Sequence, residues 1–218
     1  MKIVITAGPT REYLDPVRFL SNPSTGKMGF AIAAEAARRG DEVTLIAGPV
    51  ALKTPDRVHR VDVTSAREML KASLEGLESL EGCGNSVFIS TAAVADWRPA
   101  KCAAKKLKKG EMSGVLKLVR NPDNLKTINR SIEQSNNRTI RLVGFAAETN
   151  DILTEAARKC REKGLSFIVA NDVTKKGCGF GTDTNRVTFV FPDGTMKKFP
   201  LMTKRMVAKR ILDEVSCL

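Results

Sequence analysis

The sequence of 218 residues has little of several features on which common functional sites depend. It contains one histidine, and its five cysteines include no Cys-x-x-Cys pair, so the residues predict neither a zinc site nor a disulfide framework. Aromatic residues make up only 5% of the chain, and no helix-turn-helix, zinc-finger or ribonucleoprotein signature is present. No apolar run approaches the roughly 18 residues needed to span a bilayer. We therefore expect a globular protein with reduced thiols, located in the cytoplasm.

Acidic residues are also in the minority. Lysines and arginines number 36 against 24 acids, and the formal net charge of +12 implies an anionic partner. Nucleic acid is one candidate for that partner, and phosphorylated small molecules explain the charge equally well. Because the chain has 42% hydrophobic residues and shows no repeat or linker, we expect residues 1–218 to form a single domain.

The hydrophobic pattern predicts strands that alternate with helices, which favours an α/β fold with a doubly wound, mainly parallel sheet. The predicted strands are Lys2–Thr6, Glu42–Ala47, Val58–Val63, Val87–Ile89, Val115–Val119, Ile140–Ala147 and Phe167–Ala170. The predicted helices are Phe30–Arg39 with a cap at Ser24 or Thr25, one from Thr64 to about Leu80, one beginning at Asn121 or Asp123, Asp151–Lys163 and Thr203–Val215. Val187–Phe191 and Thr195–Pro200 flank Pro192-Asp193-Gly194, which predicts a hairpin.

The stretch from Val87 to Lys109 carries the clearest functional signal. Its apolar strand ends in the small residues Ser90-Thr91-Ala92-Ala93, which let a ligand approach the backbone closely. Asp96 follows, and the basic cluster Lys105–Lys109 comes about ten residues later, so one loop offers a carboxylate and ammonium groups to a nucleotide. The alternative is that Asp96 caps a turn and the lysines form a solvated face. The strand Ile140–Ala147 also ends in small residues, so the two strands are expected to form two walls of one pocket.

Known nucleotide-binding fingerprints are incomplete in this chain. Gly8 follows the first strand, but the full Gly-x-Gly-x-x-Gly is missing, and the pair Gly26-Lys27 lacks the rest of a phosphate-binding loop. Lys159 and Lys163 lie one helical turn apart, where a solvated helix face is the alternative to a phosphate contact.

Seven motifs, taken together and in order, resemble bacterial phosphopantothenoylcysteine synthetase. They are Ala7–Glu12 with Asp15–Arg18, Ser21-Asn22 with Ser24–Gly29, Ala92–Asp96, Lys106–Lys109, Asn121–Asp123, Gly144–Thr149 and Ala170–Val173. The resemblance spans nearly the whole chain. That family commonly occurs fused behind a flavin-dependent decarboxylase domain, for which this sequence has no room. We therefore expect either a free-standing synthetase or that domain cut from a longer protein.

The resemblance implies an amide-forming ligase of coenzyme A biosynthesis. The carboxylate of 4'-phosphopantothenate would attack the α-phosphate of CTP to give an acyl cytidylate and pyrophosphate, and the amine of L-cysteine would then displace CMP. By similarity, the nucleotide-binding residues are Ser90, Thr91, Ala92, Asp96, Lys106, Pro122, Asp123, Asn124, Leu125, Phe145, Lys159 and Lys163. Magnesium is expected with the triphosphate. No carboxylate cluster suggests a dedicated metal cage, which fits an ion held by phosphate oxygens and water.

The resemblance also implies the catalytic residues and a dimer. Asn22 would bind the acyl intermediate and assist its attack by cysteine, Arg18 would support Asn22 or bind substrate, and Lys106 would act in acyl cytidylate formation. The family is dimeric, and its lysine flap and asparagine loop help complete sites at the subunit interface. The chain departs from the family at Pro23 and Thr25, where arginine and serine are common, and at Lys105, where an acid is common.

Three alternatives stay open at this point. Eukaryotic relatives use ATP, although the motifs follow the bacterial CTP-dependent pattern. A nicotinamide-dependent oxidoreductase would use the same sheet, but the chain lacks the full glycine pattern and a catalytic tyrosine-lysine or histidine pair. A non-catalytic nucleic-acid-binding module would account for the charge alone.

Overall fold

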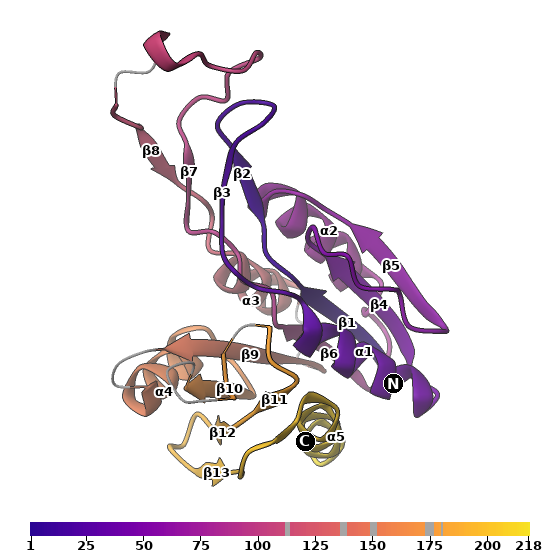
Figure 1. Ribbon diagram of the computed structural model, residues 1–218. Coiled ribbons are helices and arrows are strands. Elements are labelled where there is room, and N and C mark those ends of the chain that lie inside the picture. The colour runs from indigo at the N-terminus through magenta and orange to yellow at the C-terminus, as the bar shows by residue number, and fades with distance from the viewer. Residues whose placement is uncertain (112–113, 136–138, 149–151, 173–176, 180) are drawn as a thin grey trace.

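The computed structural model describes residues 1–111, 114–135, 139–148, 152–172, 177–179 and 181–218. Within these residues the main sheet has eight strands in the order β13-β12-β10-β9-β6-β1-β4-β5 (Figure 1). The parallel strands are β1 (Lys2–Ala7), β4 (Glu42–Ala47), β5 (Val58–Asp62), β6 (Ser86–Ser90), β9 (Ile140–Glu148) and β10 (Phe167–Asp172). Numbered along the chain, they stand in the order 3-2-1-4-5-6 of a Rossmann-like fold. The antiparallel hairpin of β12 (Val187–Val190) and β13 (Met196–Lys198) extends the β10 edge. The predicted doubly wound, mainly parallel sheet with a late hairpin is confirmed.

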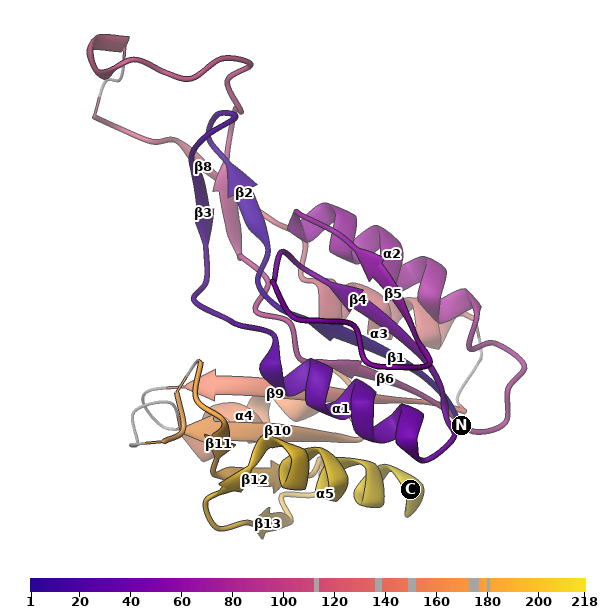
Figure 2. The same ribbon diagram turned by 45° about the vertical axis from the view of Figure 1, so that its right-hand side comes forward.

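Helices cover both faces of the sheet (Figure 2). One face carries α1 (Lys27–Arg38) and α5 (Lys204–Ser216), and the other carries α2 (Ala66–Glu78), α3 (Asn124–Gln134) and α4 (Ile152–Glu162). In strand β1, Ile3 and Ile5 are buried under α1 and α5, while Val4 is buried under the helices of the opposite face. Because both faces of the strand are covered, its apolar run is unbroken. None of the described helices has the length and apolar content needed to cross a membrane.

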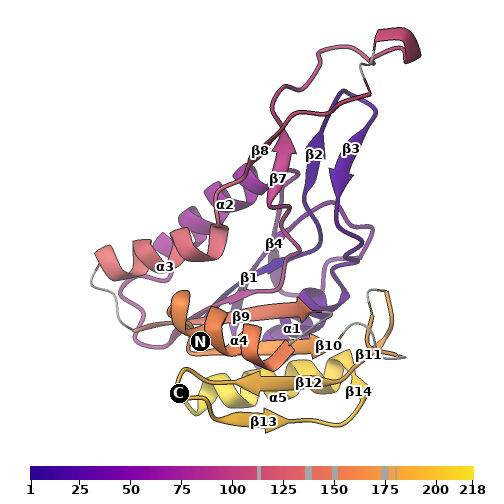
Figure 3. The same cartoon turned by 90° about the vertical axis from the view of Figure 1, so that its left-hand side faces the viewer.

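Two short ribbons leave the sheet side by side and form what we call the arm, which consists of the described residues of 11–21 and 97–120 (Figure 3). In the first ribbon β2 (Arg11–Tyr13) pairs with β3 (Phe19–Ser21), and in the second β7 (Trp97–Pro99) pairs with β8 (Leu118–Arg120). The 3-10 helix η1 (Lys109–Glu111) lies at the end of the arm far from the sheet. A further small pair, β11 (Thr184–Asn185) with β14 (Met202–Thr203), precedes α5.

The start of α1 differs from the prediction. The helix begins at Lys27, and Gly26 precedes it with a φ of 75° and no side-chain cap, so neither Ser24 nor Thr25 caps it. The Ser24 hydroxyl instead accepts from the Gly26 amide at 3.4 Å. A left-handed residue at this position favours glycine, because any other side chain would be strained there.

Two other local predictions were wrong. Helix α2 is capped by Ser65, whose hydroxyl accepts from the Glu68 amide at 3.2 Å, and the Glu68 carboxylate accepts from the amide of Thr64, so Thr64 is not the cap. The strand expected at Val115–Val119 is limited to Leu118–Arg120 because only those residues pair with β7. The predicted positions Thr149, Asp151 and Val173 lie outside the described residues.

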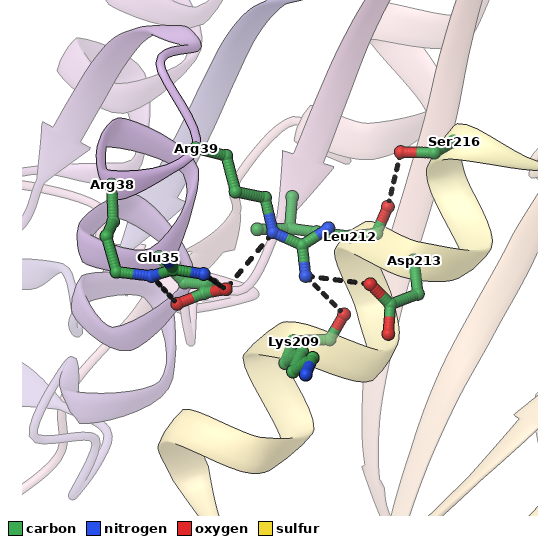
Figure 4. A network of polar contacts seen from close by, with 7 residues as sticks. All are labelled: Glu35, Arg38, Arg39, Lys209, Leu212, Asp213 and Ser216. Carbon is green, nitrogen blue, oxygen red and sulfur yellow. Dashed lines mark hydrogen bonds and ion pairs between the residues drawn. The ribbon is translucent and has the colours of Figure 1, made fainter.

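An ion-pair network joins the end of α1 to α5 (Figure 4). The Glu35 carboxylate is buried and accepts from Arg38 at 2.7 and 2.8 Å and from Arg39 at 3.1 Å. The Arg39 guanidinium continues to the Asp213 carboxylate at 2.8 Å and the Lys209 carbonyl at 3.1 Å on α5. The hydrogen bond from Arg38 lowers the pKa of Glu35 from 4.5 to about 2.

Candidate active site

A cavity of about 500 Å³ opens at the carboxyl ends of β6 and β9, beside the start of α1. This is the point where the strand order reverses between β1 and β6, and open α/β sheets bind ligands at such points. All the residues predicted to bind nucleotide, except Lys106, line this cavity: Ser90, Thr91, Ala92, Asp96, Pro122, Asp123, Asn124, Leu125, Phe145, Lys159 and Lys163. Asn22 lines it as well.

The wall between β6 and α1 is closely packed. The Thr91 hydroxyl donates to the Thr6 carbonyl at 2.6 Å. A Cβ atom added at Gly29 would lie 2.5 Å from both the Thr91 hydroxyl and the Ala7 Cβ, so this helical glycine is required for the helix to approach the sheet. Since no side chain caps α1, its first amides are suited to an anionic group in the cavity.

The start of α3 forms another wall, and Asp123 organises it. Its carboxylate caps the helix by accepting from the Lys126 amide at 3.0 Å, and it pairs with the Lys163 ammonium at 3.0 Å. Burial alone would raise the pKa of Asp123, but the Lys126 amide and the Lys163 ammonium outweigh it and lower that pKa. The buried Asn124 amide nitrogen donates to the Ala66 carbonyl at 3.1 Å, whereas its Oδ1 has no partner among the described residues.

The loop after β6 is held by three side chains. The Asn22 amide donates to the Ala93 carbonyl at 3.0 Å, the Thr10 hydroxyl accepts from the Ala95 amide at 3.0 Å, and the Asn121 amide donates to the Ala95 carbonyl at 2.8 Å. These bonds fix the backbone immediately before Asp96. The Asp96 side chain is exposed and lines the cavity, as a base or ribose contact requires.

The charged side chains of the cavity are mainly basic. They are Lys27, Lys159, Lys163 and Lys204 against Asp96 and Asp123. This excess of ammonium groups suits a phosphorylated ligand. Among the described residues, no group of three or more histidine, cysteine, aspartate or glutamate side chains could hold a metal ion.

Two predicted catalytic residues lie elsewhere. Arg18 and Lys106 do not line the cavity of their own chain, and both belong to the arm. Arg18 pairs with the Asp15 carboxylate and donates to the Leu107 carbonyl at 2.8 Å, next to the exposed Lys106. The structure therefore separates these two residues from Asn22 and the nucleotide-binding set within one chain.

Several cavity residues were not predicted. Lys27, Asn171, Asn185 and Lys204 come from four separate elements and meet at the end of the cavity near α5. The Lys27 ammonium donates to the Asp183 carboxylate at 2.7 Å, while burial and then Lys27 lower the pKa of Lys204. Lys27 and Asn171 stand inside motifs that carried the resemblance and could have been found there. Asn185 and Lys204 carry no signal in the sequence, because only the return of the chain after β12 and β13 brings them close.

The comparison with known proteins places the chain in a family. The family model described as the DNA/pantothenate metabolism flavoprotein C-terminal domain matches residues 1–218. Over 218 residues the chain is 44% identical to the coenzyme A biosynthesis bifunctional protein CoaBC of Vibrio vulnificus (strain YJ016), a match that covers 99% of this chain and 52% of that protein. It is 45% identical over 218 residues to CoaBC of Escherichia coli (strain K12), covering 99% of this chain and 51% of that protein. The chain thus spans about half the length of these curated relatives.

A solved structure agrees with the sequence matches. The crystal structure of the C-terminal domain of the coenzyme A biosynthesis bifunctional protein CoaBC superposes with a TM-score of 0.80 at 41% identity, covering 98% of this chain and 93% of that chain. The resemblance drawn from the seven motifs is confirmed at the level of the family. The chain belongs to the family of DNA/pantothenate metabolism flavoprotein C-terminal domains.

Proposed function

We propose that this chain is a ligase that joins 4'-phosphopantothenate to L-cysteine and uses CTP to activate the carboxylate. The observation that carries the proposal is the basic cavity at the reversal of the strand order, which gathers Asn22 and nearly all the predicted nucleotide-binding residues. The names of the relatives, which are coenzyme A biosynthesis proteins, support it. The family match gives no support to a nicotinamide-dependent oxidoreductase or a nucleic-acid-binding module.

In the first half of the proposed reaction, the carboxylate oxygen of 4'-phosphopantothenate forms a bond to the α-phosphorus of CTP, and pyrophosphate leaves with the electron pair of the broken bond. Lys159 on α4 and Lys163, the residue after α4, line the cavity and would neutralise phosphate charge. The small residues Ser90 to Ala92 leave room for the nucleotide, and Phe145 offers an apolar contact. Asp96 would accept hydrogen bonds from the base or the ribose.

In the second half, the amine of L-cysteine forms a bond to the acyl carbon and gives up a proton to solvent. The bond from that carbon to the CMP phosphate oxygen breaks, and CMP leaves with its electron pair. Asn22 would hold the carbonyl of the acyl cytidylate during this attack, because an amide side chain donates and accepts hydrogen bonds without titrating. The bond from Asn22 to the Ala93 carbonyl fixes the side chain beside the loop that carries Asp96. The walls of the cavity would also shield the mixed anhydride from water.

We propose that the chain works as a homodimer joined through the arm. Six of the ten large apolar side chains that are exposed in the described residues lie on the arm: Val17, Phe19, Trp97, Val115, Leu116 and Leu118. Such a concentration of apolar surface is typical of an interface between protein chains. A dimer would also explain why Arg18 and Lys106 lie away from the cavity of their own chain, since each arm would reach the cavity of the other subunit.

Magnesium is proposed as an ion carried by the triphosphate. The cavity contributes the two carboxylates Asp96 and Asp123, and Asp123 is already paired with Lys163. This donor set fits an ion that phosphate oxygens and water hold, and when bound the ion would neutralise phosphate charge. We further propose the cytoplasm as the compartment, consistent with five free thiols, and a single functional domain for residues 1–218.

The proposal is tested by pyrophosphate release with 4'-phosphopantothenate and magnesium, with CTP or ATP, and with or without L-cysteine. We expect release that requires the acid and prefers CTP, and a cysteine adduct, identified by mass, only when cysteine is present. Equal rates with ATP would overturn the choice of nucleotide. No release with either nucleotide would overturn the ligase, and binding of NAD or of nucleic acid would then be measured instead.

A further inference from the structure

Asp15, at the tip of the β2–β3 ribbon, is an acidic residue that has no assigned role. Its side chain is 0% exposed. The Oδ1 atom accepts from the Val17 and Arg18 amides at 2.9 Å each. The Oδ2 atom accepts from the Arg18 Nε at 2.9 Å and from the Leu107 amide at 3.2 Å. One buried carboxylate therefore binds donors from its own turn and from a segment 92 residues further along the chain.

The distant segment bound by Asp15 is the loop that carries Lys106. Asp15 accepts from the Leu107 amide, and Arg18, which Asp15 holds, donates to the Leu107 carbonyl at 2.8 Å. The Ala103 amide adds a bond to the Leu14 carbonyl at 2.8 Å. Both polar backbone groups of Leu107 are thus fixed, and the residues on either side of Leu107 are lysines with exposed side chains.

We propose that Asp15 is a positioning residue, which holds Arg18 and Leu107 so that Lys106 is presented from the arm in a fixed orientation. This inference rests on the proposed function, because it assigns Lys106 to the same reaction. The loop from Lys101 to Lys108 contains no helix or strand of its own, so its shape depends on bonds to its surroundings.

A carboxylate suits this position better than an amide does. In the described bonds both oxygens of Asp15 act as acceptors and face only donors. An asparagine would replace one oxygen with an NH₂ group, which would face either the Arg18 guanidinium or the backbone amides. The Asp15→Asn substitution changes almost no volume, so it should release the loop with little effect on packing.

The test compares Asp15→Asn with Glu35→Gln. Both variants remove a buried carboxylate that pairs with an arginine three residues later, but Glu35 lies on α1 and faces α5. The first measurement is limited trypsin digestion, with cleavage mapped by mass to the lysines of the loop, which are Lys101, Lys105, Lys106 and Lys108. We expect faster cleavage at these lysines in Asp15→Asn alone, at a temperature where both variants are folded.

The second measurement is pyrophosphate release. We expect a loss of about 10²-fold in kcat for Asp15→Asn, the size expected when a reacting group is misplaced by about 1 Å, and a rate near wild type for Glu35→Gln. The double variant Asp15→Asn with Lys106→Gln should lose less than the product of the two single losses, because Asp15 acts in part through Lys106. Losses that multiply would contradict the positioning role, since a general loss of stability does not depend on Lys106.

The outcomes separate the two proposals. If wild type releases no pyrophosphate, the proposed function fails, and the digestion still decides whether Asp15 anchors the loop. If wild type is active and Asp15→Asn matches Glu35→Gln in both loop cleavage and rate, the positioning role is overturned. Should Asp15→Asn not fold, Leu107→Pro removes from the loop side the amide that donates to Asp15. Unchanged cleavage at the other loop lysines and an unchanged rate in that variant would overturn the role.

Discussion

Two clusters of the molecule use the same chemistry for different purposes. Asp15 on the arm and Glu35 on α1 are both buried carboxylates, and each pairs with an arginine three residues later. In both cases the hydrogen bond from that arginine is the main cause of a lowered pKa. The Glu35 cluster joins one helix to another over the sheet (Figure 4), whereas the Asp15 cluster joins a hairpin tip to an exposed loop.

The surroundings of the two clusters differ more than their chemistry. Glu35 lies beside the buried core that α1 and α5 share with the sheet, so the pair adds to the packing that keeps the protein folded. The arm has strands of three residues each and carries exposed apolar side chains. We infer that the Glu35–Arg38 pair mainly stabilises the fold and that the Asp15–Arg18 pair mainly maintains the geometry of the site. Changes to exposed side chains of the arm should therefore alter activity and leave the free energy of unfolding nearly constant, and changes at Glu35 should do the reverse.

The largest expected effect is that of Lys106→Gln. If Lys106 neutralises phosphate charge as proposed, its removal should lower the rate of acyl cytidylate formation about 10²- to 10³-fold. The side chain is exposed, so the free energy of unfolding should change by less than about 0.5 kcal/mol. Pyrophosphate release and urea unfolding measure the two quantities, with Lys198→Gln on the exposed β13 as control. Full activity of Lys106→Gln would contradict the proposed role of Lys106 in the reaction.

Asn22→Ala should have the next largest effect, and on the other half-reaction. Pyrophosphate release should persist, while capture of the acyl cytidylate by cysteine should slow about 10²-fold, so that the intermediate accumulates. Quenched-flow samples analysed by mass measure the intermediate directly. Asn22 lies where the chain passes from the arm to α1, so an equal loss in both half-reactions would show that the residue acts on structure and not on this one step.

The proposed dimer is tested by Leu118→Asp. Leu118 lies on β8 with 39% of its surface exposed, and a carboxylate there would have to lose water in an apolar interface. We expect association to weaken by about 2 kcal/mol, measured by sedimentation, with an unchanged unfolding free energy of the monomer. Activity should then rise with protein concentration. A wild-type chain that sediments as a monomer at every concentration would contradict the proposed dimer.

Glu35→Gln should act on stability. We expect a loss of about 1–2 kcal/mol in the free energy of unfolding, because the buried carboxylate that accepts from Arg38 and Arg39 is replaced by a neutral amide. The loss stays moderate because the exposed part of the Arg38 side chain remains hydrated. The rate of pyrophosphate release per folded molecule should remain that of wild type. Urea unfolding measures the loss, and Glu155→Gln, in the more exposed pair with Arg158 on α4, is the matched control with an effect below about 0.5 kcal/mol.

The sequence predicted the sheet and most of the cavity because both depend on local patterns. Apolar runs such as Ile3 to Ile5 are buried on both faces, and such runs identify parallel strands without knowledge of the fold. The small residues at the carboxyl ends of β6 and β9 likewise signal where a ligand can approach, and Ser90 and Ala146 line one cavity. The left-handed entry to α1 through Gly26 was missed because Ser24 and Thr25 resemble helix caps in sequence.

The arm could not be predicted in the same way. Its strands are too short for a period to be recognised, and β7 and β8 pair across a long stretch of chain, as Trp97 does with Arg120. The role of Asp15 depends on a contact with Leu107 that no local pattern shows. Lys204 reaches the cavity only because α5 packs beside α1. Predictions from sequence therefore failed where distant segments meet outside the regular sheet.

The difference in stability between wild type and Glu35→Gln should depend on pH in a way that isolates the contribution of Glu35. The pKa of Glu35 is about 2 in the folded chain against an ordinary value of 4.5. The folded state therefore stabilises the ionised carboxylate relative to the protonated acid. Its stabilising effect is fully present above pH 4.5 and is lost as the pH falls toward about 2. The difference in unfolding free energy between wild type and Glu35→Gln should therefore be constant from pH 7 to about 5 and shrink at pH 3. Urea unfolding at these pH values measures the difference, and a gap that stays constant down to pH 3 would mean that the network with Arg38 and Arg39 does not stabilise the charged form.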